Sequence, residues 1–157
     1  MFTVLFACTG NTCRSPIAAA VARHYVRLHG LPVRVLSAGI HARDGDAITP
    51  EAEVALAQIG ITDSHASQGL TRELLESCDL VFVMETWQGE AIAEKILQWS
   101  LETPPDVMML DPEGNIVDPL GNGQQVYNEL THKMLGLIPN RLGAISEQFE
   151  PEAQSRG

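Results

Sequence analysis

The start of the chain restricts the fold more than any other segment. Residues 2–7 (FTVLFA) form a short, nearly continuous apolar run, which is typical of a strand buried on both faces of a parallel sheet. A loop with Gly10 and Asn11 follows, and Ser15 and Pro16 are predicted as the N-cap and the first residue of a helix. A strand that leads through a short loop into a helix predicts an α/β domain.

The rest of the chain repeats this alternation. Further strands are predicted at residues 33–37, 80–84 and 107–110, and helices at residues 16–29, 50–59, after Thr71, at 86–99 and at 125–149. Pro139 is expected to kink or break the last helix. This order predicts a three-layer α/β fold, in which a parallel sheet binds its ligand at the carboxyl ends of the strands. We expect residues 1–149 to form a single domain and residues 150–157 a frayed tail.

Composition and charge exclude several classes of protein. The chain has 157 residues, 45% of them hydrophobic, and a formal net charge of −10. Such a composition argues against disorder, and the acidic surface disfavours nucleic acid as a partner. No apolar run approaches the roughly 20 residues that span a bilayer, and no export signal is recognisable. We therefore expect a cytoplasmic protein without a membrane partner. The three cysteines, an odd number, favour free thiols, and no second Cys or His pair indicates a metal site.

The loop after the first strand carries the candidate chemistry. Its successive N–H groups and the following helix N-terminus can bind an anion, and Gly10 can take backbone angles that are closed to other residues. Arg14 can hold two phosphate oxygens, and the same positive field favours the thiolate form of Cys8, which is the nucleophile. The alternative is a buried core cysteine beside a surface arginine. The loop consists of Cys8, Thr9, Gly10, Asn11, Thr12, Cys13, Arg14 and Ser15.

The string CTGNTCRSP resembles the active-site loop of the low-molecular-weight protein phosphatase family. The similarity continues at residues 37–39 (SAG), 70–71 (LT), 79–81 (DLV) and 118–121 (DPLG), and so covers nearly the whole chain. It implies a phosphotyrosine protein phosphatase I-like fold, with a four-stranded parallel sheet flanked by helices on both faces. It also implies a mechanism without metal or cofactor, and phosphorylated proteins as partners; it does not predict the oligomeric state.

The resemblance implies roles for individual residues. Cys8 would attack phosphorus and form a phosphocysteine, while Arg14 and the loop amides bind the phosphoryl oxygens. Asn11 and Ser37 would brace the loop, and Ser15 would assist the sulfur.

Two Asp-Pro pairs compete for the role of general acid. We expect Asp118 to protonate the leaving group and then to activate water, because residues 119–121 and Tyr127 follow it as in the family. Asp111 comes directly after the predicted fourth strand and is expected to start a turn. Turn formation is also the alternative role of Asp118.

Three residues bear on substrate selectivity. Members that act on phosphotyrosine usually have Ile where this chain has Thr12, whereas Thr matches the bacterial protein arginine phosphatase branch, so phosphoarginine is favoured over phosphotyrosine. A near-isosteric replacement without functional effect is the alternative. His41 and Leu120 stand where that branch has aromatic residues, which stack on guanidinium or phenol groups, so selectivity is expected to be weaker or different here. His41 is a candidate recognition residue, and an ordinary exposed loop histidine is the alternative.

Arsenate reductase and a phosphate-binding module are the alternative functions. Arsenate reductases share the loop but use further cysteines as a relay, and Cys13 and Cys78 do not form such a pair. A phosphate-binding module without catalysis is disfavoured by the joint presence of Cys8, Arg14 and Asp118.

The resemblance also implies that oxidation links Cys8 to Cys13, although Cys13 as a packed thiol is the alternative; Cys78 is expected in the core. The remaining histidines, His24, His29, His65 and His132, are expected to have surface or packing roles.

Overall fold

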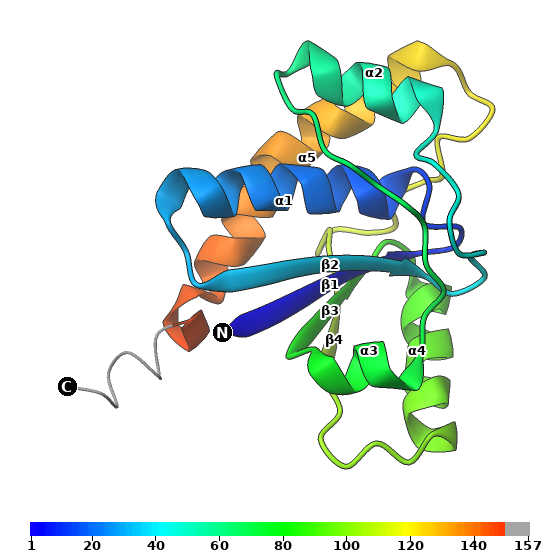
Figure 1. The fold of residues 1–157 in the computed structure, drawn as a ribbon, viewed down its shortest axis with the longest axis vertical. Helices are drawn as coiled ribbons and strands as arrows, with labels where there is room; N and C mark the ends of the chain where they lie inside the picture. Colours follow the sequence, from blue (N-terminus) through cyan, green and yellow to red (C-terminus); the bar gives the residue numbers. More distant parts are fainter. Residues whose placement is uncertain (150–157) are drawn as a thin grey trace.

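The computed structural model describes residues 1–149, and a four-stranded parallel sheet lies at its centre (Figure 1). Its strands are β1 (Phe2–Cys8), β2 (Val33–Gly39), β3 (Leu80–Val83) and β4 (Asp106–Met109). They are arranged in the order β2-β1-β3-β4, and every neighbouring pair is parallel. The predicted α/β class and sheet are confirmed, whereas the predicted tail at 150–157 lies outside the described residues.

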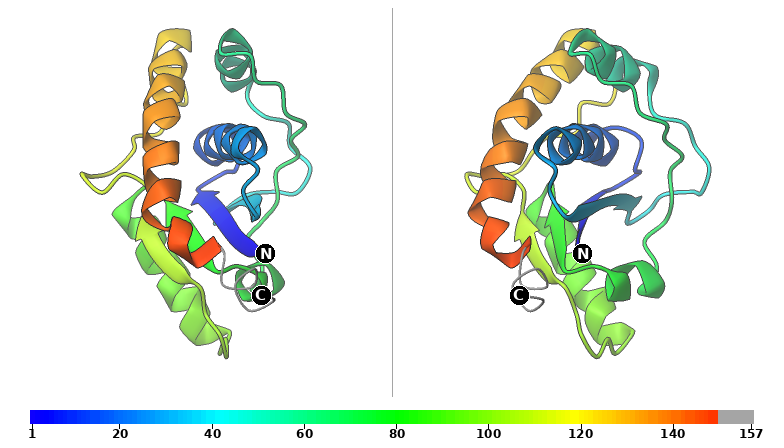
Figure 2. Two further views of the ribbon diagram at one scale, coloured as in Figure 1. Left: turned by 90° about the vertical axis from the view of Figure 1, so that its left-hand side faces the viewer. Right: turned by 60° about the vertical axis from the view of Figure 1, so that its left-hand side comes forward.

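Helices cover both faces of this sheet, as the views in Figures 1 and 2 show. Helices α1, α2 and α5 lie on one side, and α3 and α4 lie on the other. No helix of the described residues is long and apolar enough to cross a membrane. The helices are α1 (Arg14–His29), α2 (Pro50–Gln58), α3 (Arg72–Ser77), α4 (Thr86–Gln98) and α5 (Gln124–Ala144), followed by a 3-10 turn at Ser146–Phe149.

The apolar run of β1 is continuous because both of its faces are buried. Val4 and Phe6 belong to the core formed with α1 and α5, whereas Leu5 and Ala7 point into the second core, which contains Ile92 of α4. Alternate side chains of a strand point to opposite faces, so a strand between two helical layers needs an apolar residue at each position.

The predicted helix cap at Ser15 is wrong, and the last helix is not broken at Pro139. Helix α1 begins at Arg14 and has Cys13 at its N-cap position, so Ser15 lies inside the helix and does not cap it. Helix α5 continues through Pro139 as far as Ala144. On α5, the side chains that include Met134 and Ile138 are buried in the core. We attribute the continuity of α5 to this burial, which outweighs the loss of one backbone hydrogen bond at the proline.

The topology places one crevice at the carboxyl edge of the sheet. The chain leaves β1 towards β2 on one side, and β3 pairs with the other side of β1, so the connections diverge there. Cys8 at the end of β1 is in register with Gly39 at the end of β2. Open parallel sheets bind ligands at such a switch point. The loop between β1 and α1 therefore lies where a ligand is expected.

Candidate active site

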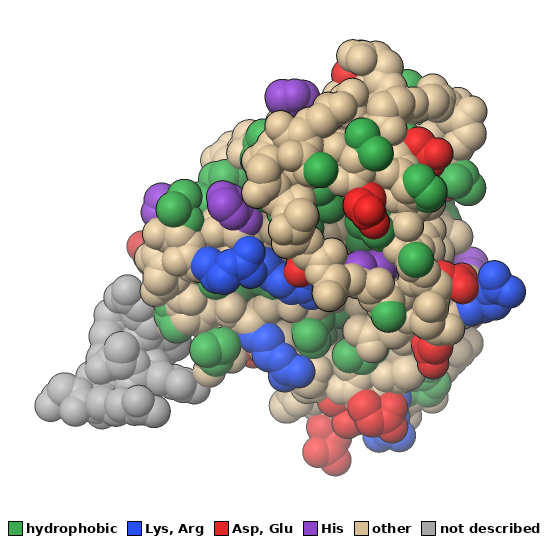
Figure 3. Space-filling model, turned by 45° about the horizontal axis from the view of Figure 1, so that its top comes forward, with side chains coloured by type: hydrophobic (Ala, Val, Ile, Leu, Met, Phe, Trp, Pro, Cys, Tyr) green, Lys and Arg blue, Asp and Glu red, His purple; other side chains and the backbone are tan. Residues whose placement is uncertain are grey.

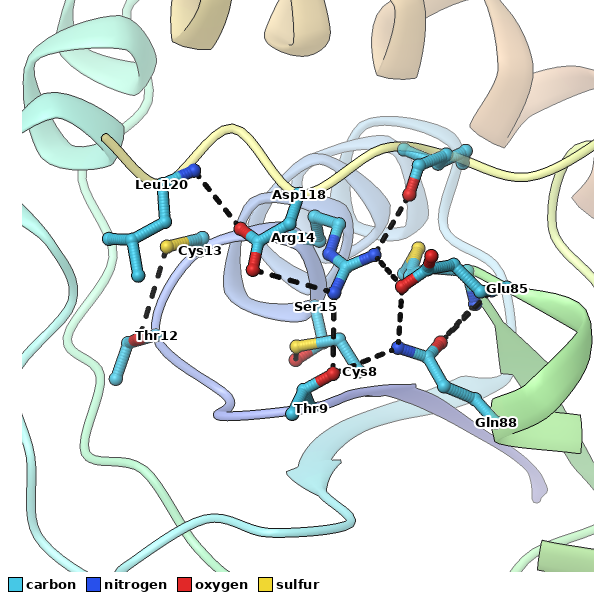
Figure 4. A network of polar contacts seen from close by, with 12 residues as sticks. Cys8, Thr9, Thr12, Cys13, Arg14, Ser15, Glu85, Gln88, Asp118 and Leu120 are labelled. Carbon is cyan, nitrogen blue, oxygen red and sulfur yellow. Dashed lines mark hydrogen bonds and ion pairs between the residues drawn. The ribbon is translucent and has the colours of Figure 1, made fainter. Parts of the chain in front are cut away.

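A pocket of about 150 Å³ opens at the end of β1. Figure 4 shows that Asp118 and Leu120 approach it from the segment before α5, opposite the loop that carries Cys8. The predicted nucleophile, arginine and acid thus meet at one cavity, although they are separated by up to 110 positions in sequence. Its lining residues are Cys8, Thr9, Gly10, Thr12, Cys13, Arg14, Asp118 and Leu120.

The Cys8 thiol has one close polar neighbour at the start of α1. Its Sγ lies 2.9 Å from the hydroxyl of Ser15, and the Asn11 side-chain amide donates to the same hydroxyl at 2.8 Å. Because the Ser15 oxygen already accepts from Asn11, its own proton is free to point at the sulfur. A hydroxyl aimed at sulfur stabilises a thiolate, and this orientation explains why Ser15 does not cap the helix.

Asn11 gives the loop its curvature. It has a φ of +56°, in the left-handed region that asparagine tolerates better than most residues. Its side-chain oxygen accepts from the Gln68 N–H at 3.0 Å, and its carbonyl accepts from Nε2 of His65 at 2.6 Å. The predicted role of Asn11 in bracing therefore has direct contacts behind it. Gly10 does not have a positive φ, so the loop takes its left-handed turn at Asn11 and not at the glycine.

The glycine that the loop requires is Gly39, on the neighbouring strand. A Cβ at this position would lie 2.6 Å from the Ala42 Cβ and 2.7 Å from the Thr9 carbonyl oxygen. The two segments approach this closely because the N–H groups of Ile40 and His41 donate to the carbonyls of Cys8 and Thr9, both at 2.9 Å. A side chain at position 39 would separate the two segments.

Ser37 was expected to brace the loop, and its connection is indirect. Its carbonyl accepts from the side-chain amide of Gln68 at 2.9 Å, and the Gln68 backbone in turn holds Asn11. His65 and Gln68, both before α3, thus support the catalytic loop. The expectation that His65 has a surface or packing role is wrong, because its ring holds the Asn11 carbonyl. Nothing local in the sequence indicates this contact.

Arg14 is held from behind by a carboxylate. Its side chain is 2% exposed, and its Nη1 donates to Glu85 at 2.7 Å and to the Ile116 carbonyl at 2.8 Å. Its Nη2 points to the pocket side, 3.4 Å from the Thr9 hydroxyl and 3.8 Å from a carboxylate oxygen of Asp118 (Figure 4). One half of the guanidinium is therefore anchored, while the other half faces the cavity.

Gln88 connects the start of α4 to the loop. It is fully buried, and its side-chain oxygen accepts from the N–H groups of Met84 and Glu85 at 2.9 and 3.0 Å. Its amide donates to the Thr9 hydroxyl at 3.2 Å and lies 3.4 Å from the Glu85 carboxylate. Glu85 and Gln88 were not predicted as site residues. Their position just after β3, at the same sheet edge as Cys8, is the signal that indicates them.

The two candidate acids have different surroundings. Asp118 is 47% exposed beside Arg14, and it also accepts from the Leu120 N–H at 3.1 Å, so it forms a turn as well. Asp111 does not line this pocket and binds Lys133 at 2.7 Å. The hydrogen bond from Lys133, followed by one from the Glu113 backbone, lowers the pKa of Asp111. Asp111 also forms the predicted turn through that bond from Glu113.

Of the three proposed selectivity residues, Thr12 and Leu120 line the pocket and His41 does not. Leu120 is 62% exposed and forms part of the rim. His41 is exposed and stacks on Trp87, with ring centroids 6.2 Å apart. The pocket and its nearest surroundings are therefore apolar on the Leu120 side and aromatic beside Thr9.

All three cysteines are free and buried. The Cys13 sulfur lies 3.4 Å from the Tyr127 hydroxyl and 3.7 Å from that of Thr49. Burial, together with the hydrogen bond to Cys13, raises the pKa of Tyr127 to about 12. Burial also raises the pKa of Cys78 to about 11, as expected for a core thiol. The linkage of Cys8 to Cys13 on oxidation stays a prediction.

Comparison with known proteins gives consistent matches along the chain. The model of the family described as low molecular weight phosphotyrosine protein phosphatase matches residues 3–150. A protein-arginine-phosphatase of Bacillus subtilis is 34% identical over 86% of this chain and 91% of its own length. A protein of the same name from Geobacillus stearothermophilus is 32% identical over 96% of this chain and 98% of its own length. A low molecular weight protein-tyrosine-phosphatase of Streptomyces coelicolor is 30% identical over 97% of this chain and 98% of its own length.

Solved structures agree with these matches. A variant of the YwlE arginine phosphatase with a phosphorylated active-site serine in place of cysteine has a TM-score of 0.84 and 32% identity, over 92% of this chain and 95% of its own. A low molecular weight protein tyrosine phosphatase from T. tengcongensis has a TM-score of 0.83 and 29% identity, over 92% of this chain and 99% of its own. Proteins named for either substrate thus share this fold.

Proposed function

Because this chain belongs to the low-molecular-weight phosphotyrosine protein phosphatase family, we propose that it removes phosphoryl groups from protein side chains, with phosphoarginine favoured over phosphotyrosine. The family is one of cysteine-dependent protein phosphatases, and this chain is one of them. The observation that carries the proposal for the site is that Cys8, Arg14 and Asp118 line one pocket.

The first step transfers the phosphoryl group to sulfur. The Cys8 thiolate attacks phosphorus, and the bond from phosphorus to the leaving nitrogen or oxygen breaks. The pocket-facing Nη2 of Arg14 and the loop N–H groups hold the phosphoryl oxygens, as charge stabilisation of phosphoryl transfer requires. Asp118, at the rim in its protonated form, gives its proton to the leaving group.

The second step releases phosphate. Asp118, now ionised, takes a proton from a water molecule, whose oxygen attacks the phosphocysteine. The bond from sulfur to phosphorus breaks, and the Ser15 hydroxyl, 2.9 Å from Sγ, stabilises the departing thiolate. Inorganic phosphate and the starting enzyme are the products. No residue beyond those around the pocket is needed for the proton transfers.

Two observations support phosphoarginine as the preferred substrate. The relatives named protein-arginine-phosphatase match at 34% and 32% identity over most of both chains. Thr12 lines the pocket, where its hydroxyl can accept a hydrogen bond from a guanidinium, which isoleucine cannot do. The Streptomyces relative, at 30% identity over a similar length, makes a tyrosine phosphatase the second candidate.

A kinetic comparison of matched phosphoarginine and phosphotyrosine peptides tests the substrate. We expect the unaltered chain to hydrolyse phosphoarginine with the higher kcat/KM, and Thr12→Ile to reduce this preference about tenfold, as expected for one lost hydrogen bond to a charged group. Cys8→Ser is the control that removes turnover of both peptides. Higher kcat/KM for phosphotyrosine would favour the second candidate, and an unchanged preference in Thr12→Ile would exclude Thr12 as the selector.

The setting of this activity also belongs to the proposal. We propose a cytoplasmic enzyme that acts on phosphorylated proteins and binds neither nucleic acid nor membranes, in keeping with a net charge of −10. Arsenate reduction by a cysteine relay is disfavoured by the contacts of Cys13, whose sulfur faces Tyr127 and Thr49. Cell fractionation with an antibody to the chain tests the location.

A further inference from the structure

Two aromatic side chains stack beside the pocket without lining it. The rings of His41 and Trp87 are 6.2 Å apart between centroids, with planes inclined by only 12°. His41 lies in the loop after β2, and Trp87 lies in the first turn of α4. Trp87 is 40% exposed. Two exposed rings from different elements that stack on each other offer an apolar surface to a ligand.

The segments that carry the two rings both bind Thr9, at one edge of the pocket. The His41 N–H donates to the Thr9 carbonyl at 2.9 Å, and Gln88, the residue after Trp87, donates to the Thr9 hydroxyl at 3.2 Å. Thr9 itself lines the pocket. A peptide whose phosphorylated residue enters the pocket therefore brings a neighbouring residue close to these rings.

The charges around the rings favour a cation. The loop of His41 also carries Asp44 and Asp46, while Arg43 of that loop is paired with Asp46 at 3.5 Å. Glu90 lies three residues after the tryptophan on α4 and is exposed. Figure 3 shows both carboxylate and Lys or Arg side chains on the face in view, while the chain as a whole has a net charge of −10. Repulsion disfavours an acidic segment here, and an indole face attracts a cation.

We infer that the stacked rings of His41 and Trp87 form a subsite for the residue next to the phosphorylated one, and that this subsite prefers arginine or lysine. The inference rests on the proposed function and adds a selection of substrate sequence to it. Stacking of an arginine or lysine side chain on Trp87 combines a cation–π contact with burial of the alkyl stem. Phosphorylated sites with basic neighbours are then the preferred substrates.

Matched phosphopeptides with either arginine or alanine on both sides of the phosphorylated residue test this subsite. We expect a kcat/KM about fivefold higher for the arginine-flanked peptide, the size of a cation–π contact at an exposed site. Trp87→Leu should bring the ratio of the two kcat/KM values close to one. Trp99→Leu is the matched control, because Trp99 lies at the other end of α4, under Lys95. That control should keep the fivefold ratio.

Binding to the Cys8→Ser chain, measured by calorimetry, separates this inference from the proposed function. If the unaltered chain hydrolyses neither peptide, the proposed function fails, but the ratio of the two dissociation constants still decides the subsite. A ratio near five that falls to one in the Cys8→Ser, Trp87→Leu double variant supports the subsite. Equal binding of both peptides, or a preference that Trp87→Leu leaves intact, overturns it.

Discussion

Removal of the Glu85 carboxylate should destabilise the fold, because this carboxylate anchors the buried side chain of Arg14. The Arg14 side chain is 2% exposed and that of Glu85 24% exposed, and they meet at 2.7 Å. Removal of one partner of a buried ion pair costs about 3–5 kcal/mol, because the other charge stays buried without compensation. Water can reach the exposed quarter of Glu85, so we expect about 3 kcal/mol for Glu85→Ala, at the lower end of that range. For a chain of this size, the Tm should fall by roughly 6–12 °C.

Urea unfolding of a double-mutant cycle measures the pair itself. The cycle combines Glu85→Ala with Arg14→Met, which keeps an unbranched side chain but removes the charge. We expect a coupling free energy of about 2 kcal/mol, since loss of Glu85 leaves Nη1 of the buried Arg14 with the Ile116 carbonyl as its remaining partner and without the adjacent carboxylate. Glu85→Gln, which keeps the shape, should lie between Glu85→Ala and the unaltered chain. A coupling free energy below about 0.5 kcal/mol would refute the anchoring of Arg14 by Glu85.

Three further changes have defined outcomes. Asp118→Asn should lower kcat about 100-fold or more for poor leaving groups and least for good ones, and equal losses along a series of aryl phosphates would contradict its role as general acid. The thiol of Cys78, with its pKa raised to about 11, should resist iodoacetamide at pH 8 until urea unfolds the chain, and peptide mapping would reveal earlier labelling. The lowered pKa of Asp111 means that its carboxylate stabilises the fold above its ordinary pKa of 3.8 and loses this effect as the pH falls through the lowered value. Asp111→Asn should therefore be less stable at pH 7 in urea titrations, and the difference should narrow below about pH 4; a gap independent of pH would exclude the pair with Lys133 as its cause.

The sequence predicted those features that depend on neighbouring residues. The buried strand at β1 is encoded by its own apolar run. The Thr71 hydroxyl accepts from the Leu74 N–H at 3.2 Å and so caps α3, the helix that was predicted to follow Thr71. Cys8 and Arg14 were recognisable because their spacing is local.

Features that depend on contacts between distant residues could not be predicted from the sequence. Glu85 is 71 positions from Arg14, and His65 is 54 positions from Asn11, so no local pattern pairs them. Helix α5 passes Pro139 because its buried side chains pack on α1, and propensity alone would have ended it there. Ser15 was assigned to a cap because its type suits one, whereas the sulfur of Cys8 competes for its hydroxyl.

The attachment of the nucleophile loop to the crossover after β2 has an evolutionary consequence. The bonds from Ile40 and His41 to the carbonyls of Cys8 and Thr9 join main chain to main chain, and they do not depend on which side chains those positions carry. Only Gly39 is fixed by the close approach. A lineage can therefore exchange the side chains that surround the opening and acquire new targets, while the anion cradle beneath is inherited intact.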